Sequence, residues 1–141
     1  MNDFDLNQRV IAEFRASAGQ IGGYLEGMPV VLVHHRGRSS GRQYVNPMVY
    51  LADAEDRDTI YVFASNSGAP ANPGWYRNLV ASGEGTVEVG TETYPVSVRE
   101  LTGAERDRVY AEQARRIPLF AGHAQKVAGI RVIPVLALIR S

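Results

Sequence analysis

The 141-residue chain contains no cysteine, and this absence excludes several kinds of chemistry. Without a thiol there is no disulfide, no thiolate nucleophile and no cysteine-based zinc or iron–sulfur site. Of the three histidines, His34 and His35 are adjacent on a predicted strand, so their side chains point to opposite faces and do not grip one ion together. We therefore expect no metal site.

The chain also lacks an excess of either charge and any long apolar run. Lys plus Arg number 15, as do Asp plus Glu, so no net charge attracts nucleic acid or acidic lipid. No stretch approaches the roughly 20 apolar residues of a membrane span. The first residues have neither the basic start nor the apolar core of a signal peptide. These features predict a cytoplasmic protein with no nucleic-acid partner.

Apolar spacing predicts the helices and strands. Apolar residues from Leu6 to Phe14 recur at helical spacing and indicate an amphipathic helix over residues 5–18. The run Val30–Val33 is typical of a strand buried on both faces, and turn residues 37–41 join it to a second strand in a predicted hairpin. Strands are also predicted over 44–51, 59–64, 86–89, 93–101 and 130–139, and helices over 75–79 and 102–116.

Two of the helix starts carry recognisable signals. Asn72-Pro73 combines a residue that caps well with one that fits the first helical position. Thr102 and Glu105 match a capping box, in which a hydroxyl and a carboxylate accept bonds from free amides. The order of elements predicts one α+β unit with a mainly antiparallel sheet, and closure into a small barrel would remove the edges of that sheet.

The turn at residues 37–41 is a candidate anion site. Arg36, Arg38 and Arg42 flank two serines and a glycine, which brings guanidinium groups, hydroxyls and free backbone amides together. A solvated basic turn is the alternative. The loop 64–70 is rich in small residues, which let a backbone approach a flat ligand. Trp75 follows this loop and either walls such a cleft or fills the core.

Three segments resemble the deazaflavin-dependent nitroreductases, also described as deazaflavin-dependent quinone reductases. They are Gly22-Gly23 with the following apolar strand and the turn 37–41, then Val45–Met48, and then the longest, Ala64–Leu79. The resemblance implies an α+β split β-barrel, mainly antiparallel, with an N-terminal amphipathic helix and short peripheral helices. It divides the chain into a helix and linker over 1–24 and a deazaflavin-binding barrel over 25–141. It also implies an oxidoreductase that binds coenzyme F-420 and passes its hydride to a small, flat electron acceptor such as a quinone or a nitro compound.

The same resemblance assigns residues to parts of the cofactor, an 8-hydroxy-5-deazaflavin whose tail carries a phosphate and several glutamates. The tail-binding turn corresponds to Arg38, Ser39, Ser40, Gly41 and Arg42. The ring corresponds to Asn46, Pro47 and Met48 on a strand, to Ala64, Ser65 and Asn66 in a loop, and to Gly74, Trp75 and Asn78 in a short helix. Relatives commonly carry Lys where this chain has Ser39, and Arg at a further cofactor position, Tyr44. Arg36 and Arg42 are the candidates to replace these two cations.

On the acceptor side, Phe120 and His123 stand in a segment where relatives are often rich in tyrosine. The anionic product of hydride transfer also needs a proton. His123 is the candidate donor, because the ordinary pKa of histidine lies near neutrality. The hydroxyl of Ser65, or water, is the alternative.

Two other functions are compatible with these features. The barrel could carry a deazaflavin without catalysis, or it could bind flavin mononucleotide or haem, since a monophosphate needs fewer cations than a glutamate tail. Barrels of this kind often form homodimers, which is a further expectation. The polar face of the N-terminal helix is balanced in charge, which favours packing onto the barrel over weak association with a membrane surface.

Overall fold

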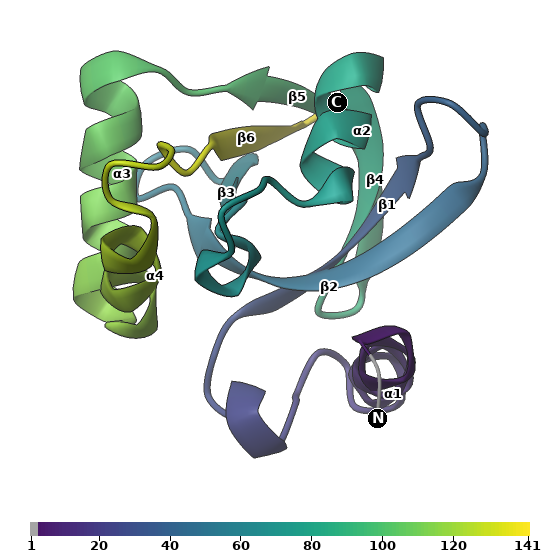
Figure 1. Ribbon diagram of the computed structural model, residues 1–141. Coiled ribbons are helices and arrows are strands. Elements are labelled where there is room, and N and C mark those ends of the chain that lie inside the picture. The colour runs from purple at the N-terminus through teal and green to yellow at the C-terminus, as the bar shows by residue number, and fades with distance from the viewer. Residues whose placement is uncertain (1–2) are drawn as a thin grey trace.

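The computed structural model describes residues 3–141, and its centre is an antiparallel barrel (Figure 1). The strands are β1 (Val30–Arg36), β2 (Gln43–Ala52), β3 (Thr59–Phe63), β4 (Glu84–Val89), β5 (Glu92–Glu100) and β6 (Val135–Arg140), in the closed order β1-β2-β3-β6-β5-β4. Around them lie the helices α1 (Asp3–Ala16), α2 (Gly74–Ser82), α3 (Gly103–Arg116) and α4 (Leu119–Val127), with short 3-10 turns η1 (Gly23–Leu25) and η2 (Asn66–Gly68). The predicted α+β barrel with an N-terminal helix and peripheral helices is confirmed.

Side chains along β1 alternate between the two faces of the strand, so one set fills the barrel and the other forms an apolar outer face. Val31 and Val33 belong to the interior cluster, whereas Val30 and Leu32 pack outward with Phe14 of α1. The four β1 side chains are at most 4% exposed. The prediction of a strand buried on both faces is therefore confirmed.

The same alternation in β3 and β6 creates a second covered side, where α3 and α4 lie (Figure 1). Phe63 of β3 and Val135 of β6 face outward and pack with Tyr110 of α3 and Phe120 of α4. The rings of Phe63 and Phe120 meet edge to face with their centroids 5.6 Å apart. The barrel thus lies between α1 on one side and the α3–α4 pair on another.

The barrel is split where β3 leaves β2. β2 pairs with β1 over residues 43–49 but with β3 only over residues 50–52. After Phe63 the chain leaves the sheet, passes through η2 and enters α2, whose Leu79 is fully buried in the interior cluster. One edge of β2 over residues 43–49 therefore has no strand partner within the described part of the chain. This opening borders the cleft in which the candidate site lies.

Neither predicted helix cap makes its side-chain bonds. Thr102 occupies the N-cap position of α3 as predicted, but its hydroxyl makes no capping bond, and the Glu105 carboxylate accepts hydrogen bonds at 3.0 and 3.2 Å from Arg99. Asn72 does not cap α2, since Pro73 occupies the N-cap position and the Asn72 side chain accepts a hydrogen bond from Arg131. At α2, a guanidinium from a distant part of the chain therefore takes the side chain that was predicted to cap the helix.

The last strand is shorter than predicted and follows a helix that the sequence pattern did not reveal. β6 begins at Val135 rather than at residue 130, because the amides of Ile130 and Arg131 donate to the carbonyl oxygen of Val127 at the end of α4 and pairing with β3 starts only at Val135. Ile130 and Val132 are exposed. Helix α4 follows Pro118 at its N-cap and contains Gly122, which weakens its helical signal. Packing of its apolar face against the barrel and α3 determines it instead.

An ion-pair network fastens α1 to the barrel. Arg15 donates two hydrogen bonds, at 3.1 and 2.8 Å, to the carboxylate of Glu88 on β4, and His34 Nε2 lies 2.6 Å from the same group. These bonds, chiefly those from Arg15, lower the pKa of Glu88 from its ordinary value. No helix within residues 3–141 is long and apolar enough to cross a membrane.

We predict that Glu88→Gln lowers the free energy of unfolding by about 1 kcal/mol at neutral pH, since Arg15 and His34 lose a charged partner. Because the pKa of Glu88 is lowered in the folded state, its contribution is complete above the unfolded-state pKa and is lost as the pH falls through the folded-state value. Urea denaturation at neutral and acidic pH measures this difference. Glu92→Gln is the control, because Glu92 makes an exposed pair with Arg140. A Glu88→Gln deficit that persists after glutamates are protonated would contradict the electrostatic explanation.

Candidate functional site

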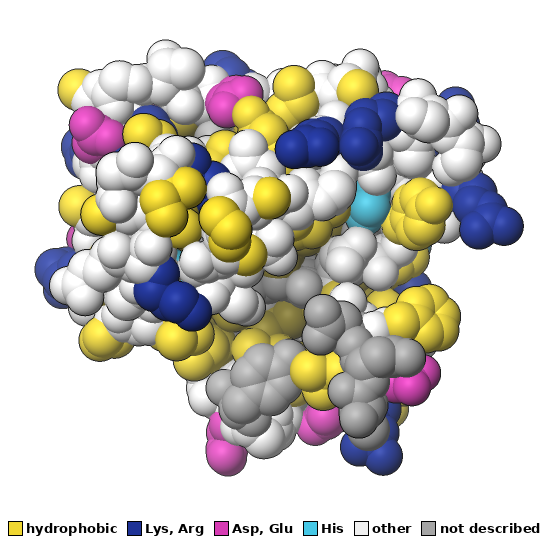
Figure 2. All heavy atoms as spheres, in the orientation of Figure 1, with side chains coloured by type: hydrophobic (Ala, Val, Ile, Leu, Met, Phe, Trp, Pro, Cys, Tyr) yellow, Lys and Arg dark blue, Asp and Glu magenta, His cyan; other side chains and the backbone are white. Residues whose placement is uncertain are grey.

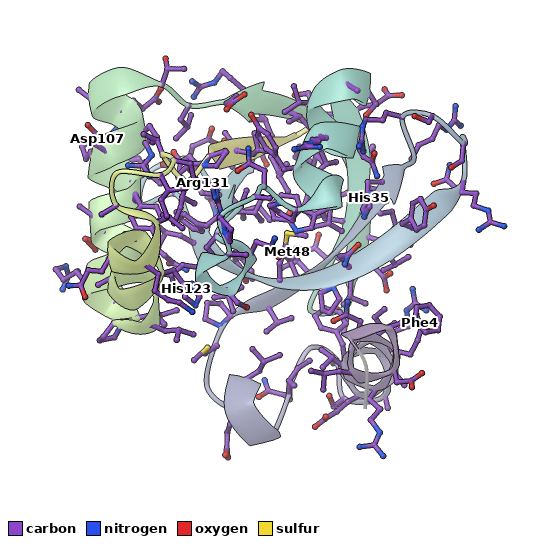
Figure 3. All side chains as sticks on the ribbon, viewed as in Figure 1. Phe4, His35, Met48, Asp107, His123 and Arg131 are labelled. Atoms are coloured by element: carbon purple, nitrogen blue, oxygen red, sulfur yellow. The ribbon has the colours of Figure 1, made fainter. Side chains whose placement is uncertain are left out.

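A cleft of about 860 Å³ lies where the barrel is split. Its walls come from the start of α1, the β1–β2 hairpin, the loop that contains η2, and the start of α2. Among the residues predicted to bind a cofactor, the following line it: Arg38, Ser39, Ser40, Tyr44, Asn46, Pro47, Asn66, Gly74, Trp75 and Asn78. In Figure 2 a cyan histidine side chain is visible at the place where Figure 3 labels His35. Lys and Arg side chains, in dark blue, lie above it and to its right.

The β1–β2 turn forms the basic end of the cleft, but most of its amides are already used. The amides of Gly37 and Gly41 donate within the turn, and that of Arg42 donates to the Ser40 hydroxyl. The amide and guanidinium of Arg38 both donate to Asn78 Oδ1, at 3.1 and 2.8 Å. The expectation of a turn with free amides is thus wrong for these four residues. An anion there would meet the Arg38 side chain and the two serines.

Gly37 permits the close packing of this turn. A side chain at residue 37 would place its Cβ 2.6 Å from Ser40 Oγ and 3.1 Å from the Tyr44 ring. The turn also matches the Gly-x-Ser-x-Gly pattern of a hydrolase nucleophile elbow, which joins a strand to a helix. Here the motif joins two strands, and Ser39 has no hydrogen bond to a histidine in the described chain. The pattern therefore does not indicate a nucleophile.

A chain of polar side chains runs from the turn across the inner wall of the cleft. Asn78 Nδ2 lies 3.1 Å from His35 Nδ1, and His35 Nε2 lies 2.7 Å from Asn46 Oδ1. His35 is 4% exposed, and its ring stacks on Tyr44 with centroids 5.5 Å apart. Burial lowers the pKa of His35 below its ordinary value, although the bond to Asn46 opposes this effect. His35 is therefore neutral at physiological pH.

The loop wall of the cleft is held by Arg131, which Figure 3 labels to the left of and above the centre of the view. Its guanidinium donates to the carbonyl oxygens of Ala64, Ser65 and Ala69 and to Asn72 Oδ1, over 2.7–3.2 Å. These acceptors flank a segment with left-handed backbone at two non-glycine residues, Asn66 (φ 48°) and Ser67 (φ 55°). Because such backbone is costly for residues with a Cβ, the Arg131 bonds offset strain in this wall.

Several predicted cofactor residues do not line the cleft. Gly41 and Arg42 lie on the solvent side of the turn, and Met48 packs with the barrel interior. Ala64 and Ser65 are buried beneath the loop, where their carbonyl oxygens bind Arg131. Arg36, a candidate to replace a missing cation, lies in a groove formed by β1, β2, β4 and β5 instead.

The predicted acceptor-side residues form a separate group on α4. Phe120 is buried against Phe63, and the His123 ring meets the Phe120 ring with centroids 5.4 Å apart. Neither residue lines the cleft. His123 Nδ1 is buried and has no hydrogen-bond partner within residues 3–141. Burial and, to a smaller extent, Lys126 lower the pKa of His123.

The sequence pattern missed several contributors to the cleft. Leu6 and Asn7 of α1 line it, although α1 was expected only to pack onto the barrel. His35 could have been found, because residues 31, 33 and 35 share the inward face of one strand. Nothing in the sequence around Arg131 indicates its role, because all its partners lie about 60 positions earlier in the chain.

The fold and this cleft define a split-barrel protein whose cleft combines a basic, hydroxyl-rich turn with apolar and amide side chains. A sequence profile described as F420H(2)-dependent quinone reductase matches residues 7–139. The chain therefore belongs to the F420H(2)-dependent quinone reductase family.

Individual proteins and solved structures are also similar to this chain. Rv3178 of Mycobacterium tuberculosis strain H37Rv, which is named after the same quinone reductase activity, is 34% identical over 88 residues, covering 62% of this chain and 71% of Rv3178. The solved structure of the F420-H2 dependent reductase FDR-A has a TM-score of 0.68 and 30% identity, covering 78% of this chain and 93% of that one. A solved domain-swapped dimer has a TM-score of 0.70 and 27% identity, covering 97% and 99%.

We predict that Arg131→Lys destabilises the protein by about 1–3 kcal/mol, because an ammonium group does not reproduce the guanidinium fork. Chemical denaturation measures the change, and limited proteolysis reports loosening of residues 64–72. Arg115→Lys is the matched control, since Arg115 pairs with Glu112 on the surface and its side chain is 70% exposed. Equal denaturation midpoints for the two variants would show that Arg131 does not hold this wall.

Proposed function

We propose that this protein binds reduced coenzyme F-420 in the cleft and supports transfer of its hydride to a quinone. The observation that carries this proposal is the composition of the cleft. A basic, hydroxyl-rich turn lies at one end, and the unpaired edge of β2 faces the η2 loop and α2 at the other. These features fit a cofactor with an anionic tail and a flat ring.

The tail end of the site is built for phosphate and carboxylate. The Arg38 guanidinium has further donors beyond the one that binds Asn78, and Ser39 and Ser40 add exposed hydroxyls. Arg42 lies beyond the cleft lining on the same turn, where it would meet an extended tail rather than a ring. Ser39 and Tyr44 replace the cations of relatives, so we expect weaker attraction for a glutamate tail than a more basic turn would give.

The ring end of the site combines flat apolar contacts with few polar groups. Pro47, Gly74 and Trp75 provide the apolar surface, and Asn46 and Asn66 provide hydrogen-bonding groups. Trp75 also packs with the interior cluster, so it both walls the cleft and contributes to the core. Such a site would orient a flat ring and exclude water from one of its faces.

In this proposal, bound reduced F-420 supplies the hydride, and the protein supplies orientation and a low-polarity surrounding. Reduction of a quinone to a hydroquinone consumes one hydride and one proton. We propose His123 as the proton donor, supported by its position on α4, which packs against η2 at the edge of the cleft. The Ser65 hydroxyl or water is the alternative donor.

The proposal for His123 predicts a particular pH dependence. Because the pKa of His123 is lowered, its charged donor form is populated only as the pH falls through that lowered value. Turnover should therefore decrease as the pH rises through it. His123→Phe should lower kcat about 10-fold or more, flatten this pH profile and leave F-420 affinity intact. Unchanged turnover in His123→Phe would remove His123 from the mechanism.

Fluorescence titration with oxidised F-420 tests the cofactor directly, with flavin mononucleotide as the control ligand. We expect saturable quenching by F-420 alone, followed by quinone-dependent oxidation of reduced F-420 in an absorbance assay. Binding without acceptor-dependent oxidation would identify a carrier. Preference for flavin mononucleotide, or no binding, would contradict the proposal.

Substitution of Ser39 sharpens this test at the tail end of the cleft. Ser39→Lys restores a cation common in relatives and should tighten F-420 binding several-fold, about 1 kcal/mol, in a manner that weakens with salt. Ser141→Lys adds the same charge at an exposed residue that does not line the cleft and should leave affinity unchanged. Equal effects of the two substitutions would place the tail elsewhere.

We also propose that the protein forms a homodimer, supported by its similarity to a solved domain-swapped dimer over 97% of its length. Light scattering coupled to size-exclusion chromatography gives the mass directly.

A further inference from the structure

The hydrogen bonds around His35 permit only one arrangement of protons. Asn78 Oδ1 receives bonds from the amide and the guanidinium of Arg38, and both of these groups can only donate. The remaining end of the Asn78 amide is therefore its NH2 group, which donates to His35 Nδ1. A ring nitrogen that accepts carries no proton, so the neutral imidazole must carry its proton on Nε2.

The same logic determines which end of the Asn46 amide faces the cleft. The Nε2–H group of His35 donates to Asn46, so the atom that receives it is Oδ1. The NH2 group of Asn46 is then left without a protein partner in the described part of the chain, and Asn46 lines the cleft. A proton on His35 Nδ1 would face the NH2 group of Asn78, so that two donors would meet without an acceptor. Rotation of the Asn78 amide by 180° would instead break both bonds from Arg38.

We infer that His35 is a positioning residue of this cleft: as the Nε2–H tautomer it holds the Asn46 oxygen and turns the Asn46 NH2 group toward the ligand. The direction of the relay originates in Arg38, whose proton donors cannot be reversed. Burial of His35, which is 4% exposed beneath Tyr44, protects the relay from water. His34, one residue earlier, faces Glu88 on the outer side and takes no part.

The orientation of Asn46 selects the chemistry of its ligand group. An NH2 donor binds an acceptor, such as a carbonyl oxygen or an unprotonated ring nitrogen at the edge of a flat heterocycle, and disfavours a donor. The identity of that heterocycle as the F-420 ring rests on the proposed function. The relay itself does not, because it is a property of the ligand-free protein.

Nitrogen-15 NMR of histidine-labelled, ligand-free protein tests the relay at neutral pH. With the His35 resonances assigned through His35→Gln, we expect a proton on Nε2 and an acceptor signal at Nδ1. A proton on Nδ1, or a cationic ring, would overturn the inference. This measurement is independent of F-420 binding.

Titration of His35 variants with F-420 tests the effect on the ligand. In His35→Gln the side-chain oxygen can accept from Asn78 and the NH2 group can donate to Asn46, so Kd should stay within about 3-fold of the wild-type value. His35→Leu loses both functions and should raise Kd about 10-fold or more. The matched controls His34→Gln and His34→Leu should bind as the wild type does.

Asn46→Asp keeps an acceptor for His35 but replaces the NH2 donor with an oxygen, and it should also raise Kd about 10-fold or more. It decides the question if His35→Leu does not fold. Wild-type affinity in Asn46→Asp would overturn the inference. Equal losses of affinity in His35→Gln and His35→Leu would also overturn it, because they would show that stacking of the ring on Tyr44 matters rather than the arrangement of donors and acceptors. If the wild type itself does not bind F-420, the proposed function fails, and the NMR result still decides the relay.

Discussion

Burial of β1, β3 and β6 on both faces is the constraint on which this structure depends. Their inward side chains, such as Val33 and Leu136, fill the barrel, and the outward ones must be covered by something else. Helix α1 covers the outer face of β1, and α3 with α4 covers those of β3 and β6. A strand covered on both faces cannot shift its register by one residue without exchanging its two apolar faces, so the register is strongly specified.

The cleft exists because this covering is incomplete at one place. Residues 43–49 of β2 precede its short pairing with β3, and the chain after Phe63 moves away from the sheet to reach α2. Polar side chains then take over from hydrophobic packing. His35 continues the inward face of β1 at the mouth of the barrel, and Arg131 holds the departing loop through its carbonyl oxygens. Neither residue has a carboxylate partner at these contacts, so both leave the cleft without added negative charge, which suits an anionic ligand.

The residues that sequence analysis placed in the cleft share a simple property: they belong to contiguous motifs. The turn around Ser39, the strand residues Asn46 and Pro47, and the helix start at Trp75 were predicted together and line one cleft. His123 was predicted from its place in the acceptor-side segment of the resemblance and from the ordinary pKa of histidine; it lies on α4, packed on Phe120, and does not line the cleft. Histidine near neutrality is a reasonable proton donor anywhere, and only packing decides whether a substrate can reach it.

The sequence by itself determined the α+β class, the both-face burial of β1, the basic turn and, through the motifs of the family, the split barrel, because periodicity and local motifs are properties of neighbouring residues. The tertiary structure decided which histidine faces the cleft, which arginine holds its wall, where the helix caps fail and where β6 begins. The physical reason is the sequence separation of the partners, which reaches 40 residues for Arg38 and Asn78 and 67 for Arg131 and Ala64. Hydrogen bonds of this kind depend on directions that are set only when the barrel has closed, and no local pattern encodes them.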